Sequence, residues 1–257
     1  MSCKIVFINL ACFVELNTVI VMTNQRYIKN EKMLSREENL SLREKKVAVV
    51  GCGGLGGFII EELGRLGIGH ITAVDGDVFE ESNLNRQLLS EPGNIGQSKA
   101  IAAKKRIETI NSDIKPSVFD EYIDENNAEK ILKGHHIVCD ALDNIPSRKL
   151  IRKACRALNI PLIYGAIAGW YGYVSTIFPE DNTLDFVYDT DEAKGEEQEL
   201  GNPSFTPALI ASLQVAEAVK LLTGKGKLLR NKLLFINCLE HNYEIFELDS
   251  PASQPVE

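Results

Sequence analysis

The chain has 257 residues, of which 44% are hydrophobic and 25% are charged. This is the composition of a folded globular protein with enough apolar material for one large core. The formal net charge of −8 at pH 7 argues against broad binding to a phosphate backbone, which needs a basic surface. We therefore expect no nucleic-acid partner, whereas a locally basic pocket for a single nucleotide remains compatible with this charge.

The six cysteines lie far apart in the sequence and form no CxxC pair. Disulfide frameworks and structural zinc sites both depend on closely patterned cysteines. We therefore expect no zinc, and we expect a protein of the reducing cytoplasm.

Residues 5–22 are apolar but are interrupted by Asn9, Glu15 and Asn17. A membrane span needs about 20 nearly uninterrupted apolar residues, and no cleavage site of small residues is evident. The alternatives are a signal or anchor, an added strand or helix, and a true translation start at Met22, which we favour. We expect residues 1–22 to be an N-terminal extension, and we expect no membrane partner.

From residue 46 onward, short apolar runs alternate with amphipathic segments, which is typical of an α/β protein with a mostly parallel sheet. The expected strands cover residues 47–50, 71–74, 117–123, 136–141 and 161–166, with a glycine turn at 51–57. The expected helices between them cover residues 58–66, 97–110, 126–132 and 146–158. The pattern predicts a Rossmann-like sheet with helices on both faces.

The C-terminal half has a different pattern. Strands at residues 173–178, 233–238 and 243–248 are expected to be antiparallel, and a strong helix at 207–222 is expected to end at Gly224. Residues 180–203 have no periodicity and hold nine Asp and Glu against one Lys, which favours a solvated loop. Because no repeat or linker is evident, we expect residues 23–257 to form a single domain.

The first predicted strand is followed by GCGGLGG, which places Gly51, Gly53 and Gly56 in a GxGxxG pattern that also contains Gly54. Glycines there permit a tight turn and let the backbone approach a phosphate at the helix N-terminus. Asp75 ends the second predicted strand, where an acidic residue binds a ribose hydroxyl. These residues alone fit an NAD-dependent oxidoreductase equally well.

Two cations that follow the second strand favour a triphosphate over a dinucleotide. In a dinucleotide site the helix amides already bind the pyrophosphate. The positive charges of Arg86 and Lys99 would then have no evident function in ligand binding. A triphosphate carries more charge, and phosphoryl chemistry needs cations near the oxygens where charge develops.

Four segments in this order carry a resemblance to a known family: GCGGLGG, DGDVFEESNLNRQ, GQSKA and CDALDNIPSR. They resemble the ThiF/MoeB/HesA adenylyltransferases of thiamine and molybdopterin biosynthesis, which are related to ubiquitin-activating enzymes. The resemblance runs from about Arg26 to Leu248 and includes FTPALIASLQVAEAVKLLTG.

The resemblance implies a site for ATP and magnesium. Asp75 would hold the ribose, Lys99 would contact phosphate, and Asp143 would hold magnesium, with Arg86, Lys99 and Asp143 as the catalytic set. The implied nucleotide-binding residues are Gly51, Gly53, Gly54, Gly56, Asp75, Asp77, Asn83, Arg86, Gln87, Lys99 and Asn144.

Other interpretations remain open at the end of the fourth predicted strand. Asp140 and Asn144 have side chains suited to capping the following helix. Arg148 is either a substrate contact or a surface charge.

The family also places a basic N-terminal residue in the partner subunit's triphosphate site, which implies a homodimer. The matching stretch is Arg26-Tyr-Ile-Lys29, where Lys29 stands in place of the family's second arginine. Lysine keeps the charge but loses the two-pronged hydrogen bonding of arginine, so which of Arg26 and Lys29 acts in trans stays open.

The implied function is ATP-dependent adenylation of the C-terminal carboxylate of a ubiquitin-like sulfur-carrier protein ending in Gly-Gly, with release of pyrophosphate. Many family members carry zinc-binding CxxC pairs or a reactive loop cysteine, yet no cysteine lies between Cys155 and Cys238 here. Adenylation is thus better supported than a thioester or persulfide step. The alternatives are activation of a modified tRNA base or small peptide, an NAD-dependent oxidoreductase, and a non-catalytic scaffold.

Overall fold

The computed structural model describes residues 25–188 and 200–248. Their strands form one sheet in the order β3-β2-β1-β4-β5-β6-β7-β8. Five strands are parallel: β1 (Lys46–Val50), β2 (His70–Val74), β3 (Lys115–Phe119), β4 (Ile137–Asp140) and β5 (Leu162–Ala168). Three continue the sheet as antiparallel neighbours: β6 (Tyr171–Ile177), β7 (Lys232–Asn237) and β8 (Asn242–Glu247). The predicted Rossmann-like sheet with an antiparallel continuation is confirmed.

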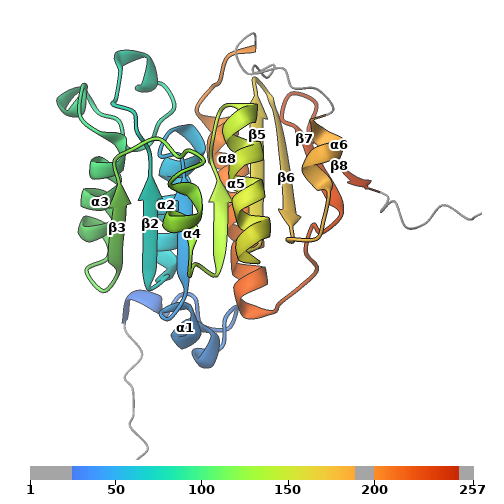
Figure 1. Cartoon of the computed structure of the whole chain (residues 1–257). Coiled ribbons are helices and arrows are strands. Elements are labelled where there is room, and N and C mark those ends of the chain that lie inside the picture. The colour runs from blue at the N-terminus through green and yellow to red at the C-terminus, as the bar shows by residue number, and fades with distance from the viewer. Residues whose placement is uncertain (1–24, 189–199, 249–257) are drawn as a thin grey trace, which may run out of the picture.

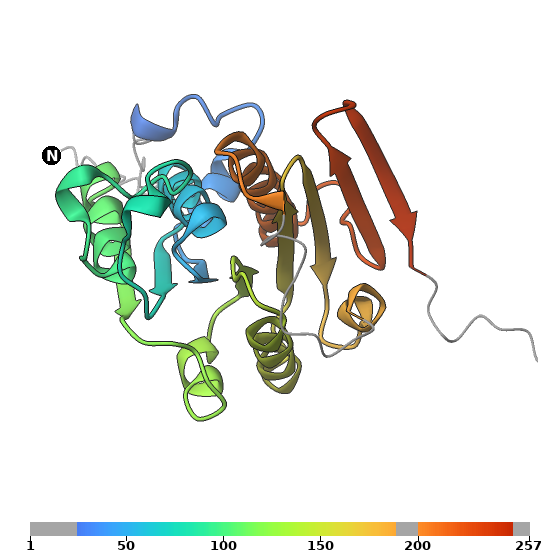
Figure 2. The same cartoon turned by 90° about the horizontal axis from the view of Figure 1, so that it is seen from above.

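Helices cover both faces of the sheet, as Figures 1 and 2 show. One face carries α2 (Gly54–Leu66), α3 (Lys99–Ile110) and α8 (Phe205–Thr223), with α1 (Arg36–Leu42) at the lower end. The other face carries α4 (Ala128–Leu132), α5 (Ile145–Leu158) and α6 (Thr183–Val187). Three short 3-10 turns, η1 (Gln25–Tyr27), η2 (Glu81–Asn83) and η3 (Pro92–Asn94), complete the described elements. As predicted, α8 ends at Gly224, which has a left-handed φ of 71°.

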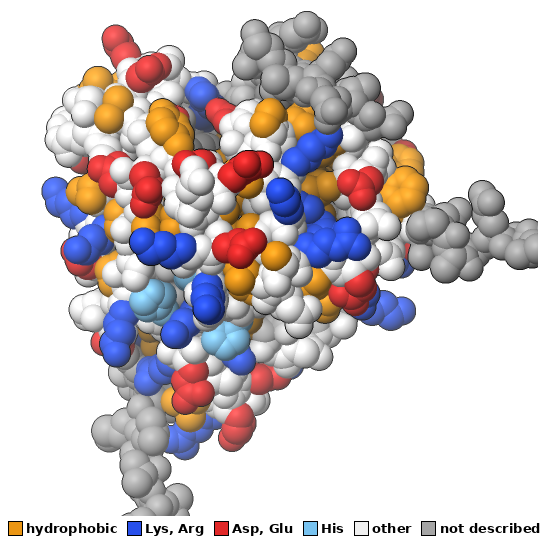
Figure 3. Space-filling model, viewed as in Figure 1, with side chains coloured by type: hydrophobic (Ala, Val, Ile, Leu, Met, Phe, Trp, Pro, Cys, Tyr) orange, Lys and Arg blue, Asp and Glu red, His pale blue; other side chains and the backbone are white. Residues whose placement is uncertain are grey.

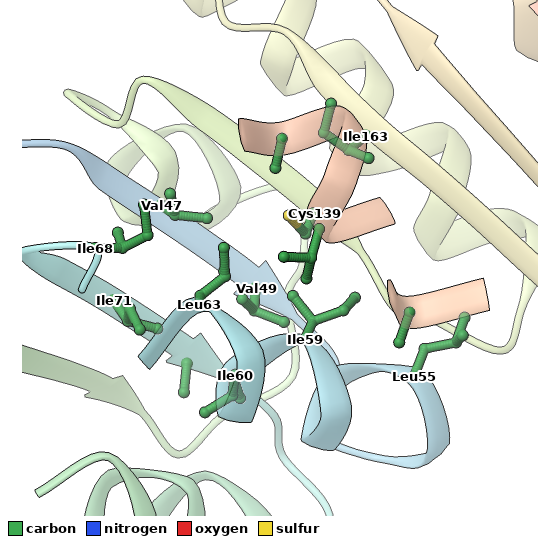
Figure 4. Close-up of a cluster of buried hydrophobic side chains, with 14 of the residues drawn as sticks. Val47, Val49, Leu55, Ile59, Ile60, Leu63, Ile68, Ile71, Cys139 and Ile163 are labelled. Atoms are coloured by element: carbon green, nitrogen blue, oxygen red, sulfur yellow. The ribbon is translucent and has the colours of Figure 1, made fainter. Parts of the chain in front are cut away.

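The larger core lies between the sheet and the α2–α8 layer (Figure 4). Val47 and Val49 point into it, whereas Ala48 and Val50 belong to the core on the opposite face, because neighbouring strand residues point to opposite sides. Helix α8 is long and apolar enough to span a membrane by composition alone. Its residues Ile210, Ala211, Val215 and Ala218 nevertheless pack in this core, which accounts for the apolar character.

Two of the predicted boundaries were wrong in ways that shape the site. The glycine turn is shorter than expected, because α2 already begins at Gly54. Strand β3 ends at Phe119, so residues 120–123 leave the sheet instead of extending it. As a result, the first residues of α2 and residues 121–123 line the pocket described below.

The predicted loop of residues 180–203 contains the helix α6, and its acidic residues are not all solvated. Asp181 is buried and pairs with Arg230 at 3.0 Å. Residues 189–199, which hold six of the nine Asp and Glu of this segment, lie outside the described residues.

Candidate nucleotide-binding site

A pocket of about 410 Å³ opens at the C-terminal ends of the parallel strands β1, β2 and β4. In this kind of sheet, ligands bind where the strand order reverses, which here is between β1 and β4. The structure brings together ten of the predicted residues as lining: Gly51, Gly53, Gly54, Asp75, Asp77, Arg86, Gln87, Lys99, Asp143 and Asn144. Gly56, Asn83, Arg26 and Lys29 are not among the lining residues.

The glycines of the turn divide into two kinds. A Cβ atom on Gly51 would lie 2.4 Å from the Ala141 carbonyl oxygen, and one on Gly56 would lie 1.8 Å from the Gly51 oxygen. These two glycines therefore serve close backbone packing. Gly53 and Gly54 have ordinary clearance, and Gly53 is the N-cap of α2 without a side-chain cap. The first amides of α2 thus face the pocket, which suits an anion.

We predict that Gly56→Ala destabilises the fold, because the new methyl group would collide with backbone that no side-chain rotation can move. The free energy of unfolding should fall by about 3 kcal/mol, in the range of overpacked cores. Urea denaturation of both proteins would measure this. Gly93→Ala is the matched control, since a Cβ there meets nothing within 4 Å, and equal losses in the two variants would contradict the packing account.

The Asp75 carboxylate braces the glycine turn from the end of β2. Its two oxygens accept backbone N–H groups of Cys52 at 2.7 Å and Asp77 at 2.8 Å. Burial raises the pKa of Asp75 above its ordinary value, with these hydrogen bonds opposing the shift. Each oxygen keeps a free acceptor site, so the carboxylate can also accept a ribose hydroxyl.

Lys99 lies at the first turn of α3, after Ser98, whose hydroxyl caps the helix. The Lys99 Nζ lies 3.0 Å from Asp77 Oδ2, and the lysine side chain is only 9% exposed. The second oxygen of Asp77 accepts a hydrogen bond from the Tyr122 hydroxyl. Tyr122 was missed by the sequence analysis, which placed it within a strand.

The SNLNRQ segment supplies the next wall of the pocket. Arg86 donates to the Ser82 carbonyl oxygen at 2.9 Å and to Asn85 Oδ1 at 2.8 Å, which holds its guanidinium at the pocket. Asn83 instead caps the local turn, because its Oδ1 accepts the Glu80 amide at 3.0 Å.

Two acceptors at the pocket have no hydrogen-bond partner among the described residues. They are Gln87 Oε1 and Asn202 Oδ1, both buried oxygens of lining residues. Buried polar atoms are normally paired.

The β4–α5 turn places Asp143 at the pocket, and contacts of Asn144 and Arg148 hold this turn in position. Asn144 is the N-cap of α5, where its Oδ1 accepts the Ser147 amide at 2.9 Å. Arg148 is fully buried, so the surface-charge interpretation is wrong. Its guanidinium donates to the Leu142 and Gly165 carbonyl oxygens and pairs with Asp140.

Within the described parts of the chain, no three His, Cys, Asp or Glu side chains gather as a metal cage. Asp143 is an exposed carboxylate at the pocket. Magnesium usually takes one or two carboxylates together with substrate phosphates and water, so this single carboxylate fits magnesium that arrives with a nucleotide.

Arg26 and Lys29 lie at the other end of the molecule from the pocket of their own chain. Arg26 donates to the carbonyl oxygen of Ile110, the last residue of α3. Lys99, at the first residue of that helix, lines the pocket. A helix of 12 residues is about 18 Å long, so these basic residues do not reach the site from within one chain.

Comparison with known proteins agrees with this geometry. The model of the ThiF family matches residues 25–256. The SAMP-activating enzyme E1 of Haloferax volcanii is 32% identical, over 84% of this chain and 81% of that protein. The sulfur carrier protein adenylyltransferase of Thermus thermophilus is 33% identical, over 79% and 78%. The crystal structure of E. coli MccB has the same fold, with a TM-score of 0.77, 22% identity, and coverage of 88% of this chain and 70% of that one. The chain belongs to the ThiF family.

Proposed function

We propose that this protein binds ATP with magnesium in the pocket and adenylates the C-terminal carboxylate of a ubiquitin-like sulfur-carrier protein. The observation that carries the proposal is the convergence of Arg86, Lys99, Asp143 and the N-terminus of α2 on one pocket. The names of the Haloferax and Thermus relatives support the activity and the class of substrate. A Gly-Gly terminus on the carrier and a role in thiamine or molybdopterin biosynthesis belong to the same proposal.

The chemistry requires little of the protein beyond positioning and charge neutralisation. A carboxylate oxygen of the carrier forms a bond to the α-phosphorus, and the bond from that phosphorus to the oxygen bridging the β-phosphate breaks. The carrier carboxylate is already ionised at neutral pH, so no base is needed. Lys99 and Arg86 would offset charge on the phosphate oxygens, and Asp143 would hold magnesium, which would supply further positive charge.

Two of the competing functions fit the charged residues of the protein less well. An NAD-dependent oxidoreductase does not explain Arg86, Lys99 and Asp143 together. A tRNA substrate needs a basic surface, whereas acidic and basic side chains intermingle on the face shown in Figure 3. A small peptide with a free carboxylate remains the alternative substrate.

Exchange of labelled pyrophosphate into ATP tests the proposal directly. We expect exchange that depends on magnesium and on a carrier ending in Gly-Gly, and that is lost when the tail of the carrier is truncated. Calorimetry should show ATP binding and little NAD binding. Tight NAD binding without ATP binding would refute the proposed function, and exchange driven by a short peptide alone would favour the alternative substrate.

We also propose that the protein works as a homodimer in the cytoplasm, with residues 23–257 as a single domain. The position of Arg26 and Lys29, away from the pocket of their own chain, suits a role in a partner's site. We predict that mixing an Arg26→Ala/Lys29→Ala chain with an Asp143→Asn chain restores part of the exchange activity. In one of the two sites of the mixed dimer, Asp143 comes from one chain and Arg26 and Lys29 come from the other. That site therefore contains all three residues unchanged. No recovery, with subunit exchange demonstrated by labelled chains, would contradict a site completed in trans.

A further inference from the structure

The charges around the pocket make the orientation of Lys99 important. Four carboxylates line it, namely Asp75, Asp77, Glu121 and Asp143, against the cations Arg86, Lys99 and Arg148. Arg148 is committed to Asp140 and to backbone carbonyl oxygens. A polyphosphate entering this pocket therefore depends on where Arg86 and Lys99 place their charges, because pair energies fall with distance.

Lys99 is held by Asp77 through both backbone and side chain. The Lys99 amide donates to the Asp77 carbonyl oxygen at 3.0 Å, and its Nζ lies 3.0 Å from Asp77 Oδ2. The Asp77 amide in turn donates to Asp75 at 2.8 Å. Hydrogen bonds hold both the amide and the carbonyl group of Asp77 in place. The orientation of the Asp77 carboxylate therefore determines the position of the Lys99 ammonium group that it binds.

The remaining oxygen of that carboxylate is bound by Tyr122. The tyrosine hydroxyl donates to Asp77 Oδ1. Tyr122 packs over Gly76, where a Cβ would lie 2.6 Å from the Tyr122 amide nitrogen and 2.7 Å from its Cγ. Its carbonyl oxygen accepts Asn127 Nδ2 at 2.9 Å, which anchors the loop after β3.

From this geometry we propose that Tyr122 is a positioning residue that sets the place of Lys99 through Asp77. The proposal rests on the proposed function, since it concerns the hold of Lys99 on the ATP phosphates. With the hydroxyl present, the charge of Asp77 is shared between two donors. Without it, Asp77 turns fully to Lys99 and competes more strongly with the phosphates for the ammonium. A tyrosine hydroxyl is protonated at neutral pH and can act as a donor, and the hydrogen bond to Asp77 raises the pKa of Tyr122 further.

The variant Tyr122→Phe removes the hydroxyl and keeps the ring against Gly76. We expect the Kd for ATP with magnesium, measured by calorimetry, to rise about fivefold, a fraction of what a hydrogen bond to a charged group contributes. The Kd for adenosine, which has no phosphate, should not change. Tyr243→Phe is the matched control, because Tyr243 lies on β8 and is 54% exposed.

A double-mutant cycle separates positioning from a merely structural role. In a Lys99→Met background, Tyr122→Phe should have no further effect on the Kd for ATP, because its action passes through the lysine. An unchanged Kd in Tyr122→Phe alone, an equal loss for adenosine, or full additivity with Lys99→Met would each overturn the inference. Failure of the wild-type protein to bind ATP would instead overturn the proposed function.

Discussion

Asp143→Asn should reduce carrier-dependent pyrophosphate exchange by about 100-fold or more. The expectation follows from the loss of the carboxylate proposed to hold magnesium, because a bound metal contributes several kcal/mol to charge stabilisation and each 1.36 kcal/mol is a factor of ten in rate. The apparent KM for magnesium should rise at the same time. Exchange rates measured over a magnesium titration would give both values.

The fold should tolerate this substitution. Asp143 is exposed, and the contact found for its side chain is one with Asn144 Nδ2 at 3.3 Å. The melting temperature of Asp143→Asn should therefore match that of the wild type. Glu129→Gln on α4 is the matched control, an exposed carboxylate in the first turn of a helix away from the pocket. If exchange by Asp143→Asn stayed near the wild-type rate at all magnesium concentrations, Asp143 would not be the metal ligand.

The fold was predictable from the sequence because its strands are short apolar runs bounded by turn residues. Val47–Val50 and Ile71–Val74 are buried on both faces, so they read as apolar segments, interrupted in the second by Thr72. The boundaries were less predictable. Gly54 begins α2 although glycine is a poor helix former, because packing of α2 on the sheet outweighs that preference.

The site was predictable where a residue's chemistry is itself the signal. Glycines after a strand, Lys99 at a helix start and Asp143 at a strand end all line the pocket. Tyr122 and Arg148 were not predictable in the same way. Their positions depend on contacts with Asp77 and Asp140, which are 45 and 8 residues away in the sequence. No local pattern records such contacts, and Arg148 looks like a surface charge until the strand end that buries it is known.

Asn83 and Asn144 illustrate a second limit. Both are in the segments that carry the family resemblance, and both cap local structure: Asn83 accepts the Glu80 amide and Asn144 accepts the Ser147 amide. The side-chain amide of an asparagine at a turn can form hydrogen bonds with the backbone or with a ligand equally well. Only the direction of its side chain distinguishes the two roles, and the sequence does not give that direction.

Arg86→Ala should lower the exchange rate by two to three orders of magnitude. Removing one preorganised donor from a transition state costs about 3–4 kcal/mol, and Arg86 is preorganised by hydrogen bonds to Ser82 and Asn85. If the arginine acts mainly in the transition state, the Kd for ATP should change much less than the rate. Single-turnover adenylation and calorimetry on the same protein would separate the two effects. Lys104→Ala on the exposed side of α3 is the matched control. A rise in Kd that accounts for the whole loss would mean that Arg86 binds ground-state phosphate and adds nothing to the chemical step.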